Sequence, residues 1–426
     1  MEMTELFDSP ESTSYTQSER IGKAADILFA SLIVLFLFSS NGIQKFPILL
    51  WVNKLSGVLL ILTSLIYTRS FYVASVLKIF FAFIIVSFFT SFFVAINADR
   101  VTDASFRLFQ LLVLLVSISQ FYILRGNVVY MLGAIVLNCV LLIMAGKFLD
   151  PEVLHQGNQI ERFTSINENP NGLAFQLLVG FISVLFFFNR TNIIGKGVVA
   201  SLSILFFYNI AISGSRKAMI AYVLIFFFFL FFSFPAKKKI FYFFVVGLIG
   251  LFAGSYLFSL VSDTAVVQRF YKLSDNAGAA DIRTQLYKEA FNAFADNPLF
   301  GIGLDNFRLY SSSGLYAHSN YMELLADTGL IGFSIYYLMY LKVWLGGSKI
   351  RRLEGRSEQS LFLSGLFKCV IILFLIIGAG SVQYDNFTHW ILLLFPVIMI
   401  EQSVLNAEEQ DSEDLNLSQN QLDLHI

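Results

Sequence analysis

The amino-acid sequence predicts an all-α polytopic membrane protein. Apolar residues occupy 56% of its 426 positions, phenylalanine alone occupies 48, and the mean hydropathy is +0.69. Soluble domains reach only about 45–50% apolar residues even when glycine is counted. A bilayer accommodates the excess because apolar side chains leave water equally well for acyl chains and for protein.

Long apolar runs set the expected number of membrane spans. A helix needs about 20 mostly apolar residues to cross the hydrocarbon core, and about twelve runs qualify. A count of ten or eleven is also compatible, because two of the runs are short and closely spaced. The expected spans are 24–42, 48–67, 72–96, 106–124, 128–148, 172–189, 197–213, 217–234, 240–261, 320–345, 361–379 and 387–403.

Lysine and arginine are more frequent in the short segments that share a side with the two ends of the chain, which predicts that both ends are cytoplasmic. The first 20 residues are polar and include acids, so we expect an uncleaved first span instead of a signal peptide. The predicted organisation is a cytoplasmic segment (1–23), nine spans (24–261), a large external loop (262–319), three spans (320–403) and a disordered cytoplasmic tail (404–426).

Charge and cysteine content exclude some functions. The net charge of −1 gives no field that would favour nucleic acid. Cys139 and Cys369 lie inside apolar runs without CxxC spacing, which predicts buried thiols.

Two external segments are long, one near 149–171 and the other at 262–319. Loops between spans are usually short, so long ones suggest function. In the second loop, apolar residues at helical spacing predict a helix that begins near Asp281 and ends before Asn297-Pro298.

Four arginines, Arg162, Arg216, Arg269 and Arg283, fall on the expected external side, against the positive-inside trend. Arg216 lies in a tight turn between two spans, which holds its charge close to the membrane surface. A guanidinium grips phosphate with two parallel hydrogen bonds, so these residues are candidates for binding a lipid-linked diphosphate. The alternative is a solvated loop charge or a lipid-headgroup contact.

His318 precedes the tenth expected span. A neutral imidazole at the membrane face accepts a proton from an attacking hydroxyl at neutral pH. The alternative is a helix cap or another polar contact.

Four motifs in order resemble the O-antigen ligase and polymerase superfamily over roughly 160–335. The strongest is His318-Ser319 followed by nine residues and then by Gly329-Leu330-Ile331-Gly332. The others are the segment 296–307, the turn Ser213-Gly214-Ser215-Arg216, and Asn169-Pro170-Asn171 with Leu173-Ala174.

The resemblance implies a fold similar to the GT-C class and a metal-independent, cofactor-free transfer of an undecaprenyl-diphosphate-linked glycan. It implies that Arg216 and Arg283 hold the diphosphate and that His318 deprotonates or orients the acceptor hydroxyl, which attacks with inversion. Arg162, Arg269 and Asp385 are weaker candidates for the same chamber. The first external loop, 41–47, contains no acid of the kind that a hard divalent ion prefers.

The resemblance further implies a bacterial inner-membrane enzyme with its active site on the periplasmic side. Its expected partners are the donor, a glycan or lipid A core acceptor, membrane lipids, and flippase and chain-length regulator proteins. A polymerase of O-antigen, capsule or exopolysaccharide is slightly favoured over an O-antigen ligase, because the segment 301–318 is short for docking a bulky acceptor.

Two other classes of function stay open. A transporter or flippase of the lipid-linked glycan would place ionisable residues near the bilayer midplane and often contain repeats. The distinctive charges here lie in external loops, which favours chemistry at the outer face. A structural subunit of an assembly complex would tolerate replacement of the external arginines and of His318.

Overall fold

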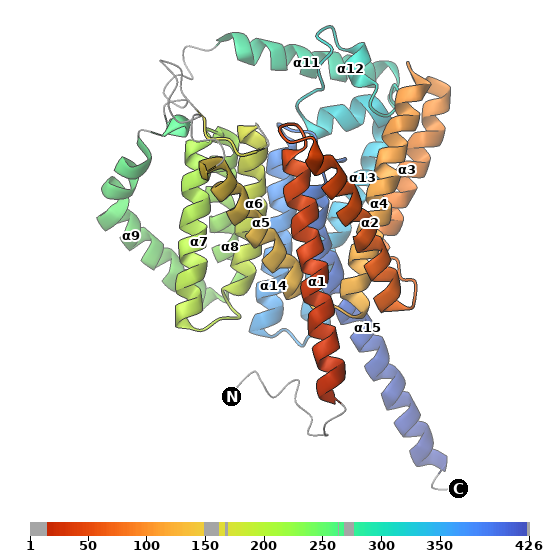
Figure 1. The fold of residues 1–426 in the computed structure, drawn as a ribbon, viewed down its shortest axis with the longest axis vertical. Helices are drawn as coiled ribbons and strands as arrows, with labels where there is room; N and C mark the ends of the chain where they lie inside the picture. Colours follow the sequence, from red (N-terminus) through yellow and green to blue (C-terminus); the bar gives the residue numbers. More distant parts are fainter. Residues whose placement is uncertain (1–14, 149–161, 167–168, 263, 268–276, 424–426) are drawn as a thin grey trace.

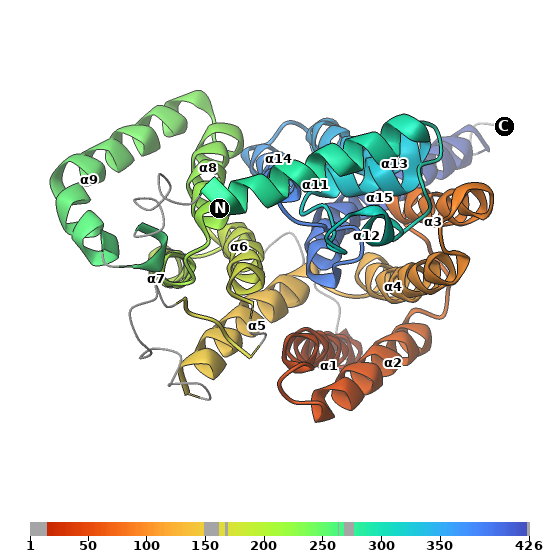
Figure 2. The same cartoon turned by 90° about the horizontal axis from the view of Figure 1, so that it is seen from above.

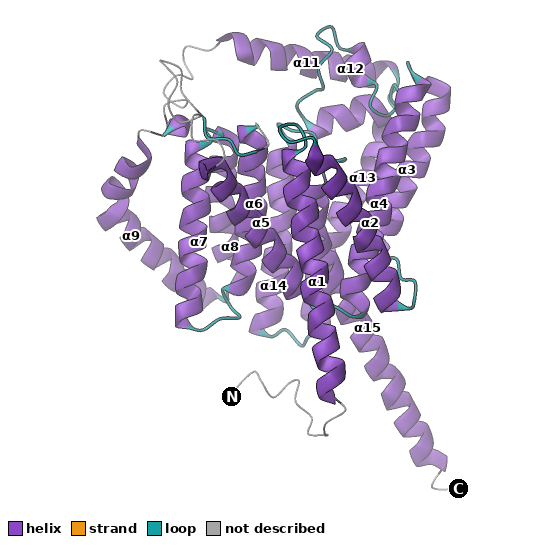
Figure 3. Ribbon diagram, viewed as in Figure 1, coloured by secondary structure: helices purple, strands orange, loops and turns teal. Residues whose placement is uncertain are grey.

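The computed structural model describes residues 15–148, 162–166, 169–262, 264–267 and 277–423, and all regular structure within them is helical (Figures 1 and 3). The helices are α1 (Tyr15–Gly42), α2 (Ile48–Thr68), α3 (Ser75–Val94), α4 (Ala98–Leu124), α5 (Val128–Phe148), α6 (Pro170–Phe187), α7 (Ile193–Ile212), α8 (Arg216–Ser233), α9 (Ala236–Ser262), α11 (Ala277–Asp296), α12 (Phe307–Tyr310), α13 (Asn320–Leu353), α14 (Glu358–Gly378) and α15 (Phe387–Asp423).

Eleven helices in the described part of the chain are long and apolar enough to cross a membrane, namely α1–α8 and α13–α15. The prediction of an all-α polytopic membrane protein is therefore confirmed. The expected span 240–261 falls in α9, where most side chains of the second half lie outside the described residues. α9 runs from the end of α8 toward the face that carries α11, so it makes a further passage between the two faces (Figure 1).

The centre of the bundle is formed by the spans that are apolar on every side. In α6 and α14, 78% and 72% of the span is buried, whereas only 22% is buried in α2 and in α7. Seen from above, α6 lies inside the molecule while α2 and α7 lie nearer its edge (Figure 2). Lipid solvates the apolar side chains that the outer helices expose. Cys139 and Cys369 are buried free thiols, as predicted.

The helix α11 lies across one end of the bundle, on the face opposite the start of α1 and the end of α15 (Figure 1). It ends at Asp296 as predicted but begins at Ala277, one turn before Asp281. Its buried side chains, Leu286, Ala290 and Ala293, form a small second core with residues of α12 and α13. This packing fixes α11 over the mouth of the bundle.

The helix α13 is broken at Gly329, whose φ of 60° and ψ of −166° are not helical. The break admits the backbone of the segment 298–303: the N–H of Leu330 donates to Pro298 O at 2.8 Å, and the N–H of Ile302 donates to Ala326 O at 2.9 Å. A Cβ at Gly329 would lie 2.4 Å from the carbonyl carbon of Leu299. The Gly-x-x-Gly motif therefore begins with a residue that must be glycine for this loop to dock.

The tail predicted as disordered at 404–426 differs in the structure, where α15 continues to Asp423. The membrane-embedded part of α15 already supplies the helical nucleus, so continuing the helix costs little. Glu, Gln and Leu, which are frequent in the tail, are also favourable helix formers.

Candidate active site

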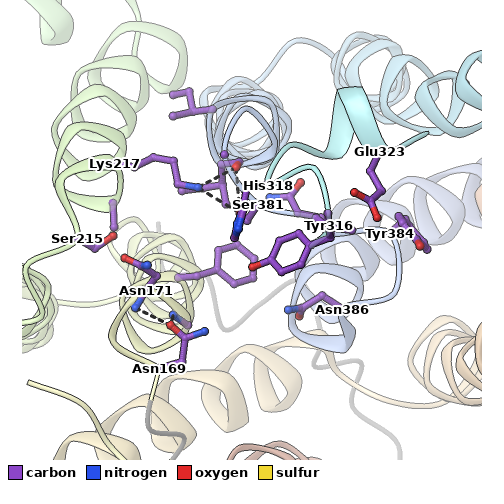
Figure 4. A pocket seen from close by; sticks show the side chains of 18 of the residues that line it. Asn169, Asn171, Ser215, Lys217, Tyr316, His318, Glu323, Ser381, Tyr384 and Asn386 are labelled. Carbon is purple, nitrogen blue, oxygen red and sulfur yellow. Dashed lines mark hydrogen bonds between the residues drawn. The ribbon is translucent and has the colours of Figure 1, made fainter. Parts of the chain in front are cut away.

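A cavity of about 650 Å³ lies beneath α11, where several helix ends meet (Figure 4). Its walls come from the starts of α6 and α8, from α11 and α12, from the loop before α13, and from the connection between α14 and α15. The polar side chains that line it are Asn169, Asn171, Ser215, Arg216, Lys217, Arg283, Arg308, Tyr316, His318, Glu323, Ser381, Gln383, Tyr384, Asp385 and Asn386.

Two helices begin at this cavity. The Asn169 side chain caps α6 by accepting hydrogen bonds from the N–H groups of Asn171 and Gly172 at 3.1 and 3.2 Å. Arg216 and Lys217 form the first turn of α8. Helix N-termini carry partial positive charge and unsatisfied N–H groups, which favour anions. The two cationic side chains add full charges to that field.

Arg162 lies beside this wall and is not among the residues that line the cavity. Its Nε donates to Ser213 O and its Nη2 to Asn171 Oδ1, both at 2.8 Å. Gly214, in the same turn, has a φ of +66°, and a Cβ there would lie 3.2 Å from Arg162 Nε. The guanidinium thus joins the start of α6 to the turn that presents Arg216.

Lys217 also reaches across the cavity wall. Its Nζ donates to Ile377 O and to Ser381 Oγ, both at 3.3 Å. These acceptors lie at and just beyond the end of α14, where helix carbonyls lack partners within the helix. The contact ties α8 to α14 and holds the ammonium beside the cavity (Figure 4).

His318 is half-buried and has a left-handed φ of 53°. Its ring packs against the ring of Tyr316, with centroids 4.0 Å apart. The loop is fixed by Glu323, whose Oε2 accepts the N–H of Ala317 at 2.5 Å. Burial lowers the pKa of His318 below its usual 6.5, and the charges of Arg283, Lys217 and Arg308 lower it further. The imidazole is therefore neutral at pH 7 and able to accept a proton.

Arg308 approaches the cavity from α12. Its guanidinium carbon lies 5.2 Å from the centroid of the Tyr316 ring, and its Nε lies 3.7 Å from Asp305 Oδ1. Asp305 has a left-handed φ of 59° and is held by Asp327, whose Oδ2 accepts its N–H at 2.9 Å. The buried carboxylate of Asp327 also accepts the N–H of Phe307 at 2.8 Å. Asp327 thus shapes the turn that presents Arg308.

The connection between α14 and α15 supplies a part of the wall that has no cation of its own. Gln383 is 2% exposed, and Asn386 Oδ1 caps α15 by accepting the N–H of Thr388 at 2.9 Å. Asp385 is open to the cavity, but the surrounding protein raises the pKa of its carboxyl group. Burial also raises the pKa of Tyr384 well above its usual value.

The structure brings His318, Arg216, Arg283 and Asp385 together around one cavity. Arg162 supports the wall from behind, and Arg269 lies outside the described residues. Sequence reasoning missed Lys217, Arg308, Tyr316, Glu323 and Gln383 as lining residues. For Lys217, its place next to Arg216 was a usable indication; Arg308 and Tyr316 lie in the segment between the family-like loop and His318.

Within the described ranges, no group of three His, Cys, Asp or Glu side chains is placed to hold a metal ion. The metal independence of the reaction stays a prediction. Residues 200–337 match the family model described as O-antigen ligase. Comparison with curated proteins gave no match. The matched region contains α8, α11, α12, the His318 loop and the start of α13, and thus all four lysine and arginine residues that line the cavity.

Proposed function

Because its domain at residues 200–337 makes this chain a member of the O-antigen ligase and polymerase superfamily, we propose that it is a glycan polymerase that uses undecaprenyl-diphosphate-linked repeat units. The family implies a lipid-linked glycan donor and a glycosyltransferase-like enzyme. The proposal adds the acceptor, a second lipid-linked repeat unit, and places the reaction at the outer face of the bacterial inner membrane.

One observation carries the proposal: a neutral histidine and a group of cations face the same cavity. Arg216, Lys217, Arg283 and Arg308 line it together with His318. A diphosphate carries its charge at the membrane surface, and fixed guanidinium groups stabilise the further charge that develops as it leaves. Burial lowers the pKa of His318, and Arg283, Lys217 and Arg308 lower it further, so three of these cations serve both the leaving group and the base.

The proposed reaction is a single displacement at the anomeric carbon. The acceptor hydroxyl oxygen bonds to that carbon while its proton passes to His318. The bond between the anomeric carbon and the phosphate oxygen breaks, and undecaprenyl diphosphate leaves with the electron pair, held by Arg216 and Arg283. Attack from the face opposite the leaving group inverts the anomeric configuration.

An O-antigen ligase is the second candidate, and the description of the matched family favours it. Chemistry at the donor would be the same, while the acceptor would be lipid A core. The choice between the two therefore depends on the acceptor.

Glycan profiling of a deletion strain tests both candidates. We expect the deletion to abolish polymer while single lipid-linked repeat units persist, and wild type but not His318→Ala to restore polymer at equal protein level by immunoblot. Full-length polymer that accumulates on the carrier lipid would identify a ligase instead. Full rescue by His318→Ala would refute the role of His318 and favour a transport or scaffold function.

A further inference from the structure

The amide of Gln383 is a buried polar group that the proposed mechanism does not use. The side chain is 2% exposed and borders the cavity. Among the described residues, neither its Nε2 nor its Oε1 has a hydrogen-bond partner. An unpaired buried amide is costly, about 1–3 kcal/mol, so a group of this kind in a cavity wall requires an explanation.

The backbone of Gln383 is held firmly on both sides. Its N–H donates to Asn320 Oδ1 at 2.9 Å, and its carbonyl accepts from His389 Nδ1 at 3.1 Å. Since His389 Nδ1 donates, its Nε2 accepts from the Tyr340 hydroxyl, 2.8 Å away. Only the side chain of Gln383 is then left without a hydrogen bond among the described residues, and this residue borders the cavity.

The connection that carries Gln383 supplies no cation of its own, although Lys217 bonds Ser381 near its start. Lys217 and Ser215 lie on one side of His318 and Tyr316, whereas Tyr384 and Asn386 lie on the other (Figure 4). The connection between α14 and α15 contributes two amides, a phenol and a carboxyl group and contains no lysine or arginine. Such groups suit sugar hydroxyls better than phosphate, because they offer both donors and acceptors.

We propose that Gln383 is a specificity-determining residue of a sugar subsite formed by the connection between α14 and α15. Its amide donates one hydrogen bond to, and accepts one from, hydroxyl or amide groups of the sugar next to the bond being formed. This inference rests on the proposed function and lies outside the region matched by the family, residues 200–337. That sugar belongs either to the donor or to the acceptor.

Gln383→Leu removes the hydrogen bonds and keeps a similar volume. In the free protein no bond is lost, so we expect the melting temperature of purified Gln383→Leu to equal or exceed that of wild type. Two binding probes are then compared: undecaprenyl diphosphate, and lipid-linked repeat units extracted from the deletion strain. The affinity for undecaprenyl diphosphate should stay within twofold of wild type.

A donor sugar in the subsite predicts about tenfold weaker binding of the lipid-linked repeat unit. An acceptor sugar predicts about a tenfold higher KM for the released, lipid-free glycan used as acceptor, whereas a donor sugar leaves that KM unchanged. Gln402→Leu is the matched control, because Gln402 bonds Tyr122 O at 2.8 Å far from the cavity; its binding and transfer should match wild type.

Two results would overturn the subsite. Unchanged sugar binding and unchanged transfer would show that the amide contacts no sugar. Equal loss of binding for both probes, with a lowered melting temperature, would show a structural role. If wild type itself neither binds undecaprenyl diphosphate nor transfers glycan, the proposed function fails first, so the two failures are distinguishable.

Discussion

The rings of Tyr316 and His318 lie with their centroids 4.0 Å apart at an interplanar angle of 49°. The guanidinium of Arg308 also lies over the Tyr316 ring, and Asp305 holds that guanidinium in turn. His318 has a backbone conformation that non-glycine residues rarely adopt, so its position depends on these contacts and on the Glu323 bond to Ala317. Tyr316 is thus a positioning residue for the proposed base.

Replacing Tyr316 tests this positioning. Tyr316→Leu removes the ring against His318, and we expect kcat to fall about 10- to 100-fold with little change in the KM for the lipid-linked repeat unit. Tyr316→Phe keeps the ring and should retain most activity. In vitro transfer with purified protein separates kcat from KM. Comparable activity of the Leu and Phe variants would show that the ring does not position the base.

The pH dependence of transfer should report the neutral form of His318. Burial and the charges of Arg283, Lys217 and Arg308 lower its pKa below 6.5. A base acts only when unprotonated, so kcat/KM should be constant near pH 7 and fall about tenfold per pH unit below the pKa. Activity that instead rises on acidification would contradict the assignment of His318 as base.

Removing a cation near His318 should move the acidic limb of the pH profile to higher pH. Arg308→Gln removes a positive charge that opposes protonation, so the pKa of His318 rises and activity is lost at a higher pH. Arg100→Gln is the matched control, because Arg100 also contacts Asp305, at 3.9 Å, but is not among the charges that lower the pKa of His318. Whatever the plateau activity of each variant, the acidic limb should lie at a higher pH in Arg308→Gln than in Arg100→Gln.

Hydropathy predicted the fold well because each span is a continuous apolar run. Lipid favours apolar residues on the exposed faces of a span, so the runs can be recognised without knowing how the helices pack. That His318, Arg216 and Arg283 lie around one cavity was predictable, because each lies in or near a local motif on one expected side; their roles stay predictions. Gln383 and Arg308 were not, because their approach to His318 depends on how α12 and the connection between α14 and α15 pack. The helical tail was missed because its polar composition resembles that of disordered segments.

The contribution of Arg216 to transfer should depend on the shape of its guanidinium group as well as on its charge. We expect Arg216→Ala to abolish transfer with normal membrane insertion, and Arg216→Lys to impair it by at least about tenfold, because an ammonium lacks the planar fork that binds phosphate. Glycan profiling and membrane fractionation of complemented strains measure both. Full activity of the Lys variant would show that charge alone suffices.

Arg162 should behave differently from Arg216, although both are external arginines. Arg162 bonds Ser213 O and Asn171 Oδ1 and so supports the turn that presents Arg216. Arg162→Lys keeps the charge but has a single donor nitrogen where Arg162 uses two, so it should lower transfer only a few-fold, together with a lower melting temperature. Loss as complete as in Arg216→Ala at an unchanged melting temperature would instead place Arg162 in direct contact with the substrate.

Gly329 should be required for the structure of the site. Its φ of 60° and ψ of −166° lie where only glycine is unstrained, and a Cβ would meet the backbone of Leu299 at 2.4 Å. We expect Gly329→Ala to displace the segment 298–303 from α13, to destabilise the protein by about 2–4 kcal/mol and to abolish transfer.

Gly355→Ala is the matched control that distinguishes the steric clash of a Cβ from the strain of a positive φ. Gly355 also has a positive φ, 68°, but a Cβ there would have no neighbour within 4 Å. Its substitution should cost only about 1 kcal/mol and leave transfer intact. Thermal unfolding in detergent, followed by size-exclusion chromatography, compares the two variants. Equal melting temperatures would mean that the close approach of Leu299 to α13 does not limit the size of the side chain at position 329. Docking of the segment 298–303 would then not explain why the Gly-x-x-Gly motif begins with glycine.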